Sequence, residues 1–469
     1  MRFRSIIPIS LAIVAIASCG GGSDDNGNTA SDGTTGASTG SAPEAGESTG
    51  GGAINGAVIS LLSPELGLFA IDRATDAVTD LKMPGVGFVD RENQPMLIGD
   101  AVYTMTRTTI EGQSFSNNIG LGKVDLASGE GSEIVQIGTD RETDDSQDLN
   151  EYALIGGDDT TIWVERSKFA ESAGSTYMSF DSESGAAGTE FTASEYDVTT
   201  DSGTCSGDFR DAIVASDGRI IGVTSGWPSV VDQANGEVEP LADWCSFDDS
   251  LVLSNLITAS EFNDFATAED GAPLPSDKAQ QLVDFIETPI SDNTMVEGDG
   301  SLWWVFQRNT AYQSGDASVA VSVGGIAEFD LTTNSVVNVW PFGPESVTFE
   351  AGEDGSPGTV SSLSQADLRY LDGELWIMDS RDGAPLRVLD PATGELTLIE
   401  IPKKDGIDAT SATLISSDPD SIWLDVTQWV VTVDDDELES KSGDGFIDQL
   451  DPATRTFVSS IDQNSIILS

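Results

Sequence analysis

The chain has 469 residues, of which 80 are Asp or Glu and 21 are Lys or Arg, giving a formal charge of −59. It contains no histidine and three cysteines, which excludes a Ser-His-Asp triad, a histidine-ligated metal or haem and a histidine pH switch. Such a negative surface also lacks the Lys and Arg needed to displace phosphate counterions, so we expect no nucleic-acid partner.

The first 18 residues have the pattern of a signal peptide. Arg2 and Arg4 precede an apolar run that is too short to span a bilayer, and small residues follow it. The end of this segment, Ile16-Ala17-Ser18-Cys19, resembles the bacterial lipobox, in which the cysteine is acylated and becomes the mature N-terminus. The resemblance implies lipidation of Cys19 and a lipoprotein anchored in the bacterial cell envelope, outside the cytoplasm. Ordinary secretion is the alternative.

Residues 19–52 are almost entirely small and polar. This composition cannot bury enough apolar surface to offset the entropy lost on ordering. We therefore predict a flexible low-complexity tether, with the folded domain over residues 53–469.

A short pattern recurs along that domain: apolar residues, an aspartate, a turn rich in Thr, Gly, Ser or Asn, and another apolar run. Its seven aspartates are Asp72, Asp125, Asp181, Asp232, Asp330, Asp390 and Asp451. They lie 51 to 61 residues apart except for one interval of 98 residues. Most copies follow a tight polar turn that leads into an apolar strand, as in Asp372-Gly373-Glu374-Leu375-Trp376. Each unit is typical of four short antiparallel strands, called A to D here from the inside outward.

Seven such units predict an all-β fold, a seven-bladed β-propeller. The first unit, near Ala57, lacks a strand A, whereas Ser465 to Ser469 has no unit after it. Pairing of these N- and C-terminal strands would close the ring and remove an exposed edge. An eighth blade could occupy the long interval, but helical spacing within Ser276 to Glu287 favours a small helical insertion at about residues 245–292.

The connections between strands differ in length. The A–B and C–D turns are short and leave one face, whereas long B–C and D–A connections leave the other. Long connections on a rigid scaffold usually carry binding. Five polar residues that open the A strands could ring the channel mouth on this face, for a ligand or for water alone: Glu151, Asp211, Asn293, Arg369 and Asn464.

Two further features concern bonding and packing. Cys205 and Cys245 fall in successive D–A connections, so we predict a disulfide in an oxidising compartment, with two free thiols as the alternative. Four tryptophans share one place in the repeat and predict packing between blades rather than a stacking platform: Trp163, Trp303, Trp376 and Trp423.

Acidic runs at residues 140–148 and 434–437 could bind Ca²⁺ or Mg²⁺, since both ions prefer oxygen ligands. Neither run has the spacing of a calcium loop. A charge run is usually a solvated face, and we favour this interpretation for both runs.

The segment from Asp372 to Pro402 resembles the repeat of streptogramin lyase (virginiamycin B lyase-like) propellers, and similar hairpins occur in quinoprotein-like propellers. The resemblance implies a seven-bladed propeller. It carries over no catalytic residue, because the lyase relies on a histidine and this chain has none.

We therefore expect a monomeric, membrane-anchored extracytoplasmic propeller that binds a protein, glycan or small-molecule ligand without catalysis. The alternative is a lyase or hydrolase that uses carboxylates and a divalent metal at the channel mouth. A third possibility is a structural role as a spacer in the envelope.

Overall fold

The computed structural model describes residues 53–61, 67–81, 88–89, 95–110, 116–141, 149–168, 174–194, 196–200, 203–207, 209–224, 227–241, 258–260, 276–283, 290–314, 317–350, 366–379, 384–404, 411–434, 437–463 and 466. The predicted signal peptide and tether lie outside the described residues.

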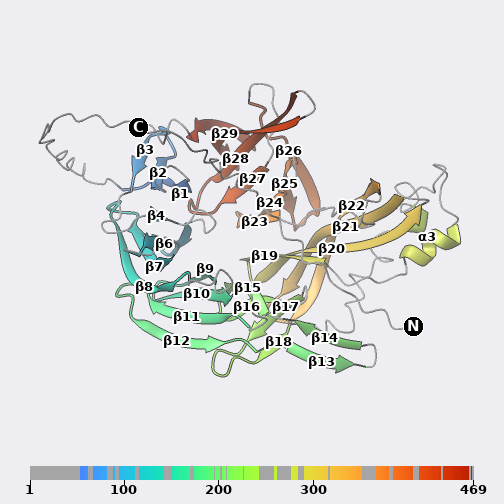
Figure 1. The fold of residues 1–469 in the computed structure, drawn as a ribbon, viewed down its shortest axis with the longest axis horizontal. Helices are drawn as coiled ribbons and strands as arrows, with labels where there is room; N and C mark the ends of the chain where they lie inside the picture. Colours follow the sequence, from blue (N-terminus) through green and yellow to red (C-terminus); the bar gives the residue numbers. More distant parts are fainter. Residues whose placement is uncertain are drawn as a thin grey trace, which may run out of the picture. The chain divides into compact units, whose positions relative to one another are not determined.

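Seven antiparallel sheets follow one another as the blades of a β-propeller, which confirms the predicted fold class (Figure 1). Blade 1 comprises β1 (Gly56–Leu61), β2 (Gly67–Asp72) and β3 (Val78–Asp80). Blade 2 comprises β4 (Phe88–Val89), β5 (Met96–Ile98), β6 (Ala101–Thr109), β7 (Asn117–Asp125) and β8 (Gly131–Thr139). Blade 3 comprises β9 (Asn150–Gly157), β10 (Thr161–Lys168), β11 (Thr176–Asp181) and β12 (Ala187–Thr192).

The remaining blades each have four strands. Blade 4 comprises β15 (Phe209–Val214), β16 (Ile220–Thr224), β17 (Trp227–Val231) and β18 (Val238–Pro240). Blade 5 comprises β19 (Ile290–Gly298), β20 (Ser301–Ser314), β21 (Ala317–Asp330) and β22 (Ser335–Glu350). Blade 6 comprises β23 (Ala366–Leu371), β24 (Glu374–Asp379), β25 (Leu386–Asp390) and β26 (Glu395–Ile399). Blade 7 comprises β27 (Ser411–Ile415), β28 (Ile422–Asp434), β29 (Glu437–Asp451) and β30 (Thr456–Asp462).

Two elements are inserted between blades. A hairpin of β13 (Tyr196–Thr200) and β14 (Gly203–Gly207) joins blades 3 and 4. Helix α3 (Ser276–Val283) lies between blades 4 and 5 and confirms the predicted helical insertion; residues 284–287 of the expected helix are outside the described residues. No eighth sheet occurs in this interval among the described residues.

The repeated aspartate of each blade closes the turn between strands C and D. In blade 1, the carboxylate of Asp72 accepts hydrogen bonds from the backbone N–H of Thr75 at 2.9 Å and from its hydroxyl at 2.7 Å. Asp125, Asp181 and Asp390 accept equivalent bonds from a Ser or Thr three residues later. These bonds to the charged form lower the pKa of Asp72. The sequence pattern therefore recurs because each blade needs the same turn.

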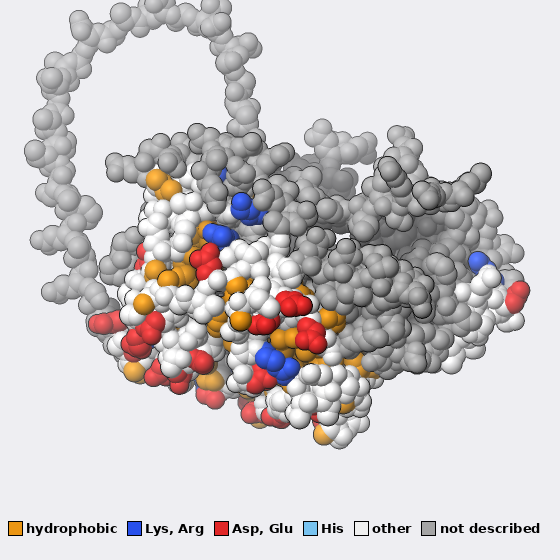
Figure 2. Space-filling view, turned by 90° about the horizontal axis from the view of Figure 1, so that it is seen from below, with side chains coloured by type: hydrophobic (Ala, Val, Ile, Leu, Met, Phe, Trp, Pro, Cys, Tyr) orange, Lys and Arg blue, Asp and Glu red, His pale blue; other side chains and the backbone are white. Residues whose placement is uncertain are grey.

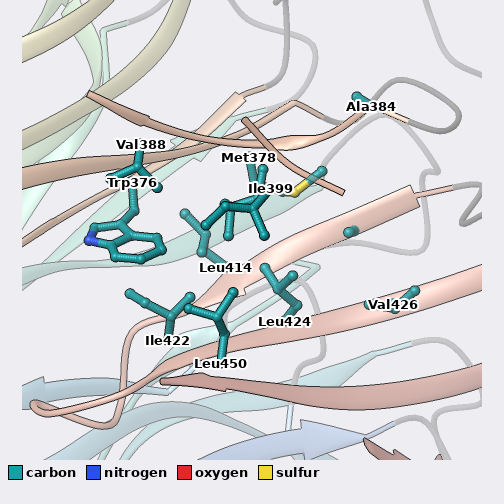
Figure 3. Packing of buried hydrophobic residues seen from close by; sticks show 12 residues of the cluster. Trp376, Met378, Ala384, Val388, Ile399, Leu414, Ile422, Leu424, Val426 and Leu450 are labelled. Atoms are coloured by element: carbon teal, nitrogen blue, oxygen red, sulfur yellow. The ribbon is translucent and has the colours of Figure 1, made fainter. Parts of the chain in front are cut away.

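Apolar clusters fill the seams between successive blades, including the seam between blades 7 and 1. Figure 3 shows the seam between blades 6 and 7, where Trp376 and Met378 lie against Leu414 and Leu424. The four repeated tryptophans are at most 7% exposed, and each belongs to the cluster facing the following blade. This confirms the prediction that they pack between blades.

Polar groups of blades 1 and 7 also join the two ends of the ring. The Ser417 hydroxyl accepts a hydrogen bond from the Val58 N–H at 2.9 Å and donates one to the Val58 carbonyl at 2.5 Å. Ile466 is buried and packs against β1 and blade 7. The described part of blade 1 has three strands. Residues 467–469 lie outside the described residues, so pairing of the terminal strand with β1 stays a prediction.

Three connections expected to be long loops are extended hairpins instead. β20 and β21 remain paired as far as Ser314 and Ala317, and β28 and β29 as far as Asp434 and Glu437. In blade 2, β6 and β7 remain paired as far as Thr109 and Asn117. The reason lies in composition, because segments such as Val319–Val323 are rich in β-branched residues, which favour strands over loops.

Candidate functional site

The two faces of the propeller are built differently. We call the face that carries the A–B and C–D turns the short-turn face, and the opposite face the hairpin face. Two-residue Asp-Gly turns close the A–B hairpins of blades 5 and 6, where Asp299, Gly300, Asp372 and Gly373 all have φ between 51° and 84°. Positive φ at both positions is the requirement of a tight hairpin turn. The short-turn face therefore has little connecting chain in these blades.

Basic side chains bridge the blades on the short-turn face. Arg73 of blade 1 forms an ion pair with Asp418 of blade 7, and its Nε lies 3.1 Å from Asp418 Oδ2. Arg455 of blade 7 forms an ion pair with Glu374 of blade 6 at 2.5 Å. Similar bridges come from Lys123 to Glu183 at 2.7 Å and from Arg219 to the Leu331 carbonyl at 2.9 Å. These contacts assign a structural role to the short-turn face.

Asp418 is the centre of the bridge between blades 7 and 1. Its side chain is fully buried, whereas that of Arg73 is 23% exposed. The carboxylate also accepts hydrogen bonds from the Trp423 Nε1–H at 2.7 Å and from the Asp420 N–H at 3.0 Å. Four N–H donors thus satisfy the oxygen atoms of this buried carboxyl group.

Long hairpins project from the hairpin face. The four longest strands among the described residues are β22, β29, β20 and β21, with 16, 15, 14 and 14 residues. Those of blade 5 extend beyond the neighbouring blades in Figure 1. The β28–β29 hairpin and the inserted β13–β14 hairpin add further surface. This face therefore carries long connections of the kind on which binding sites are usually built.

The predicted channel-mouth residues do not share one environment. Glu151 on β9 and Asp211 on β15 are exposed, and these two strands contact each other. Asn293 lies on β19, but its side chain and the whole of Asn464 are outside the described residues. The structure therefore brings Glu151 and Asp211 to neighbouring inner strands, and a binding role for either stays a prediction.

Arg369 occupies a different place from its predicted partners. It is 7% exposed and donates hydrogen bonds to carbonyl oxygens of blade 7, at 3.2 Å to Ile415 and 2.6 Å to Ser421, and also to Asp418. Burial lowers its pKa to about 10. Its donors are thus used on the short-turn side of the seam between blades 6 and 7, and its binding role stays a prediction.

The structure also reveals a buried carboxyl group that the repeat pattern does not mark. Glu165 of β10 is 6% exposed, and its Oε2 accepts a hydrogen bond from the Ala212 N–H at 3.4 Å. Burial is the main cause that raises the pKa of Glu165, and the nearby charge of Asp211 adds to it. Glu165 and Asp211 are therefore two neighbouring carboxyl groups in unlike environments, the arrangement from which acid–base pairs are built.

Several predictions about bonds and ions stay untested. Cys205 lies on β14, in the connection between blades 3 and 4 as expected, but its side chain and all of Cys245 are outside the described residues, as is Cys19. Within the described ranges, no group of three or more Asp, Glu or Cys side chains is placed to hold a metal ion. On the face viewed in Figure 2, Asp and Glu side chains are scattered among uncharged ones. Binding of Ca²⁺ or Mg²⁺ therefore stays a prediction.

No helix in the described part of the chain is long and apolar enough to cross a membrane. No family model and no curated protein matches the chain. The likeness of its repeat to streptogramin lyase repeats therefore stays a prediction.

Solved structures resemble the chain at low identity. A puromycin hydrolase is 14% identical with a TM-score of 0.35, and the match covers 84% of this chain and 50% of that one. A europium-containing methanol dehydrogenase is 9% identical with a TM-score of 0.32, covering 79% and 73%. The extracellular domain of a putative hybrid two-component system from B. thetaiotaomicron is 10% identical with a TM-score of 0.34, covering 87% and 52%. The chain thus spans half the length of the puromycin hydrolase it matches.

Proposed function

We propose that this chain is a lipid-anchored, extracytoplasmic β-propeller that binds a protein, glycan or small-molecule partner on its hairpin face without catalysis. The observation that carries the proposal is the unlike construction of the two faces. Basic side chains of the short-turn face hold blades together, whereas hairpins project from the hairpin face. The absence of histidine adds support, because it removes the commonest general base.

The proposed anchor rests on the lipobox-like residues that end at Cys19 and on the tether of residues 19–52. Metabolic labelling with a radioactive fatty acid and partition between detergent and water test this anchor. The parent chain should take up label and enter the detergent phase, whereas Cys19→Ala should remain unlabelled and stay in water. A Cys205→Ala variant is the matched control and should behave like the parent. Equal labelling of Cys19→Ala and the parent would disprove the anchor.

Binding on the hairpin face can be tested by photo-cross-linking in intact cells. A photoreactive residue is placed at Gln313, beside the tip of the β20–β21 hairpin, and in a second variant at Asp76, an exposed turn residue of the short-turn face. Cross-links at Gln313 that are absent at Asp76 support the proposal. Replacing residues 308–323 by Asn-Gly should abolish them while leaving the Gln307–Gly324 pair to close a shorter hairpin. Equal cross-linking at both faces would contradict the proposal.

The pair of Glu165 and Asp211 favours a second candidate, a hydrolase or lyase at the channel mouth. In that function Glu165 would act as the acid and Asp211 as the base, because their environments separate their tendencies to ionise. Loss of turnover in both Glu165→Gln and Asp211→Asn, with folding retained, would support this candidate. Full turnover in either variant would exclude the pair from catalysis.

A further inference from the structure

The seam between blades 3 and 4 contains a buried carboxyl group, Glu165, for which the cost of burial exceeds the effect of the donors around it. Residues of β10 alternate between the two sides of the sheet, so Glu165 lies on the same side as Trp163 and faces blade 4. The hydrogen bond from the Ala212 N–H is long at 3.4 Å, and the hydroxyl groups of Ser175 and Tyr177 are the other donors near the carboxyl group. A carboxylate in such a place pays a large desolvation cost, so the neutral acid is favoured.

A second carboxyl group stands beside it. Asp211 lies in a bulge of β15, where the register with β16 shifts between Arg210 and Ile213. Its backbone has a φ of 52°, a conformation that non-glycine residues seldom adopt. Since Asp211 is exposed, it keeps its hydration and its charge more easily than Glu165 does. A proton shared by the two groups is therefore held on Glu165.

A buried hydroxyl completes the group. Tyr177 is the cross-strand partner of Glu165, and its ring is fully buried against Phe191 and Phe209, with centroids 5.5 Å and 5.6 Å away. Within the described ranges its hydroxyl has no hydrogen-bond partner of normal geometry. Asp211 and Tyr177 are the titratable groups that act on Glu165, and neither is a cation. Ionisation would make Glu165 a stronger acceptor for the Tyr177 hydroxyl, but it would also place the negative charges of Glu165 and Asp211 near each other.

We propose that Glu165 and Asp211 form a one-proton site in the seam between blades 3 and 4, and that loss of this proton loosens the seam beside the β13–β14 hairpin. The link to the hairpin is covalent and short, because β14 ends at Gly207 and β15 begins at Phe209. Ionised Glu165 would repel Asp211, and this repulsion would act on the β15 bulge, in which Asp211 already has a strained backbone conformation. The site does not depend on any ligand, so it goes beyond the binding function proposed above.

Near-ultraviolet circular dichroism of the whole protein tests the site, because Tyr177 belongs to the aromatic cluster of the same seam. The parent should show one transition between about pH 4 and about pH 9, with its midpoint above the usual range of Glu. Glu165→Gln should abolish this transition and keep the low-pH spectrum throughout. Asp211→Asn should move the midpoint to lower pH, since removal of a neighbouring negative charge favours ionisation.

Glu190→Gln is the matched control, because Glu190 is an exposed residue of β12 in the same blade. It should titrate like the parent. The proposal is overturned if Glu165→Gln titrates unchanged or if Asp211→Asn leaves the midpoint in place. Should Glu165→Gln fail to fold, carbon-13 NMR of the glutamate carboxyls in the parent and in Asp211→Asn decides. One carboxyl must titrate well above the others, and in Asp211→Asn it must titrate at lower pH.

Discussion

The bridge between Arg73 and Asp418 should contribute more to stability than any exposed ion pair of the propeller. Arg73→Met removes two donors from a carboxylate that is fully buried, while the Trp423 and Asp420 donors remain. Loss of hydrogen bonds to a buried charge costs about 1.5 to 3 kcal/mol, and complete separation of a buried pair about 3 to 5 kcal/mol. Because Arg73 is 23% exposed and two donors remain, we expect a loss of about 2 to 3 kcal/mol.

Arg455→Met provides the matched comparison. Arg455 also bridges two blades, but Arg455 and its partner Glu374 are 33% and 26% exposed. Pairs of this kind contribute about 1 kcal/mol or less. Urea unfolding of the purified variants at one salt concentration gives both free energies. If Arg73→Met costs no more than Arg455→Met, or if Arg73→Met and Asp418→Asn add without coupling, the bridge does not stabilise the ring as argued.

Three other predictions concern single groups. Burial raises the pKa of Asp367 to about 6, so the folded state binds this proton more tightly than the unfolded state does. The stability that this proton contributes, roughly 2 to 3 kcal/mol, should be lost as pH rises from about 4 through about 6. Asp367→Asn should remove this pH dependence from the melting curve. Trp423→Phe should lower the free energy of unfolding by about 1.5 to 3 kcal/mol more than Trp376→Phe does, as measured by urea titration. The reason is that Trp423 Nε1 donates a hydrogen bond to buried Asp418, whereas Trp376 Nε1 has no partner within the described ranges. If Cys205 and Cys245 are linked, reduction should cost about 4 kcal/mol in the chain-entropy model, and the double variant to Ala should lose all response to reductant.

The repeat could be predicted from the sequence because each copy solves the same local problem. An aspartate at the end of strand C can accept hydrogen bonds from residues two and three positions later. Its role can therefore be predicted from a few adjacent residues. The tryptophans of strand B are predictable for a related reason, since every blade must fill the seam to the next. Periodicity therefore revealed the blades, the turns and the core together.

The candidate sites were less accessible to such reasoning because their partners are distant in the chain. The guanidinium of Arg369 donates hydrogen bonds to carbonyl groups that are 46 to 52 residues away in the chain. No local sequence pattern indicates such distant partners. The place of Glu165 in strand B is taken by the buried apolar residues Val305 in blade 5 and Met378 in blade 6, but by Asp425, another buried carboxyl residue, in blade 7. A carboxyl group at a position that is apolar in other blades is therefore the signal that could have identified Glu165, and it identifies Asp425 as well.

The distribution of positive charge separates the roles of the two faces. The chain has 21 basic residues against 80 acidic ones. Each basic side chain that joins two blades therefore leaves fewer basic side chains for other contacts. Arg73, Lys123, Arg219, Arg369 and Arg455 all contact a neighbouring blade at or near the short turns. A ligand that approaches this face meets groups that already have partners, and displacing them would weaken the ring. The hairpin face has no such constraint from these five side chains, so sequence change there leaves these contacts between blades in place.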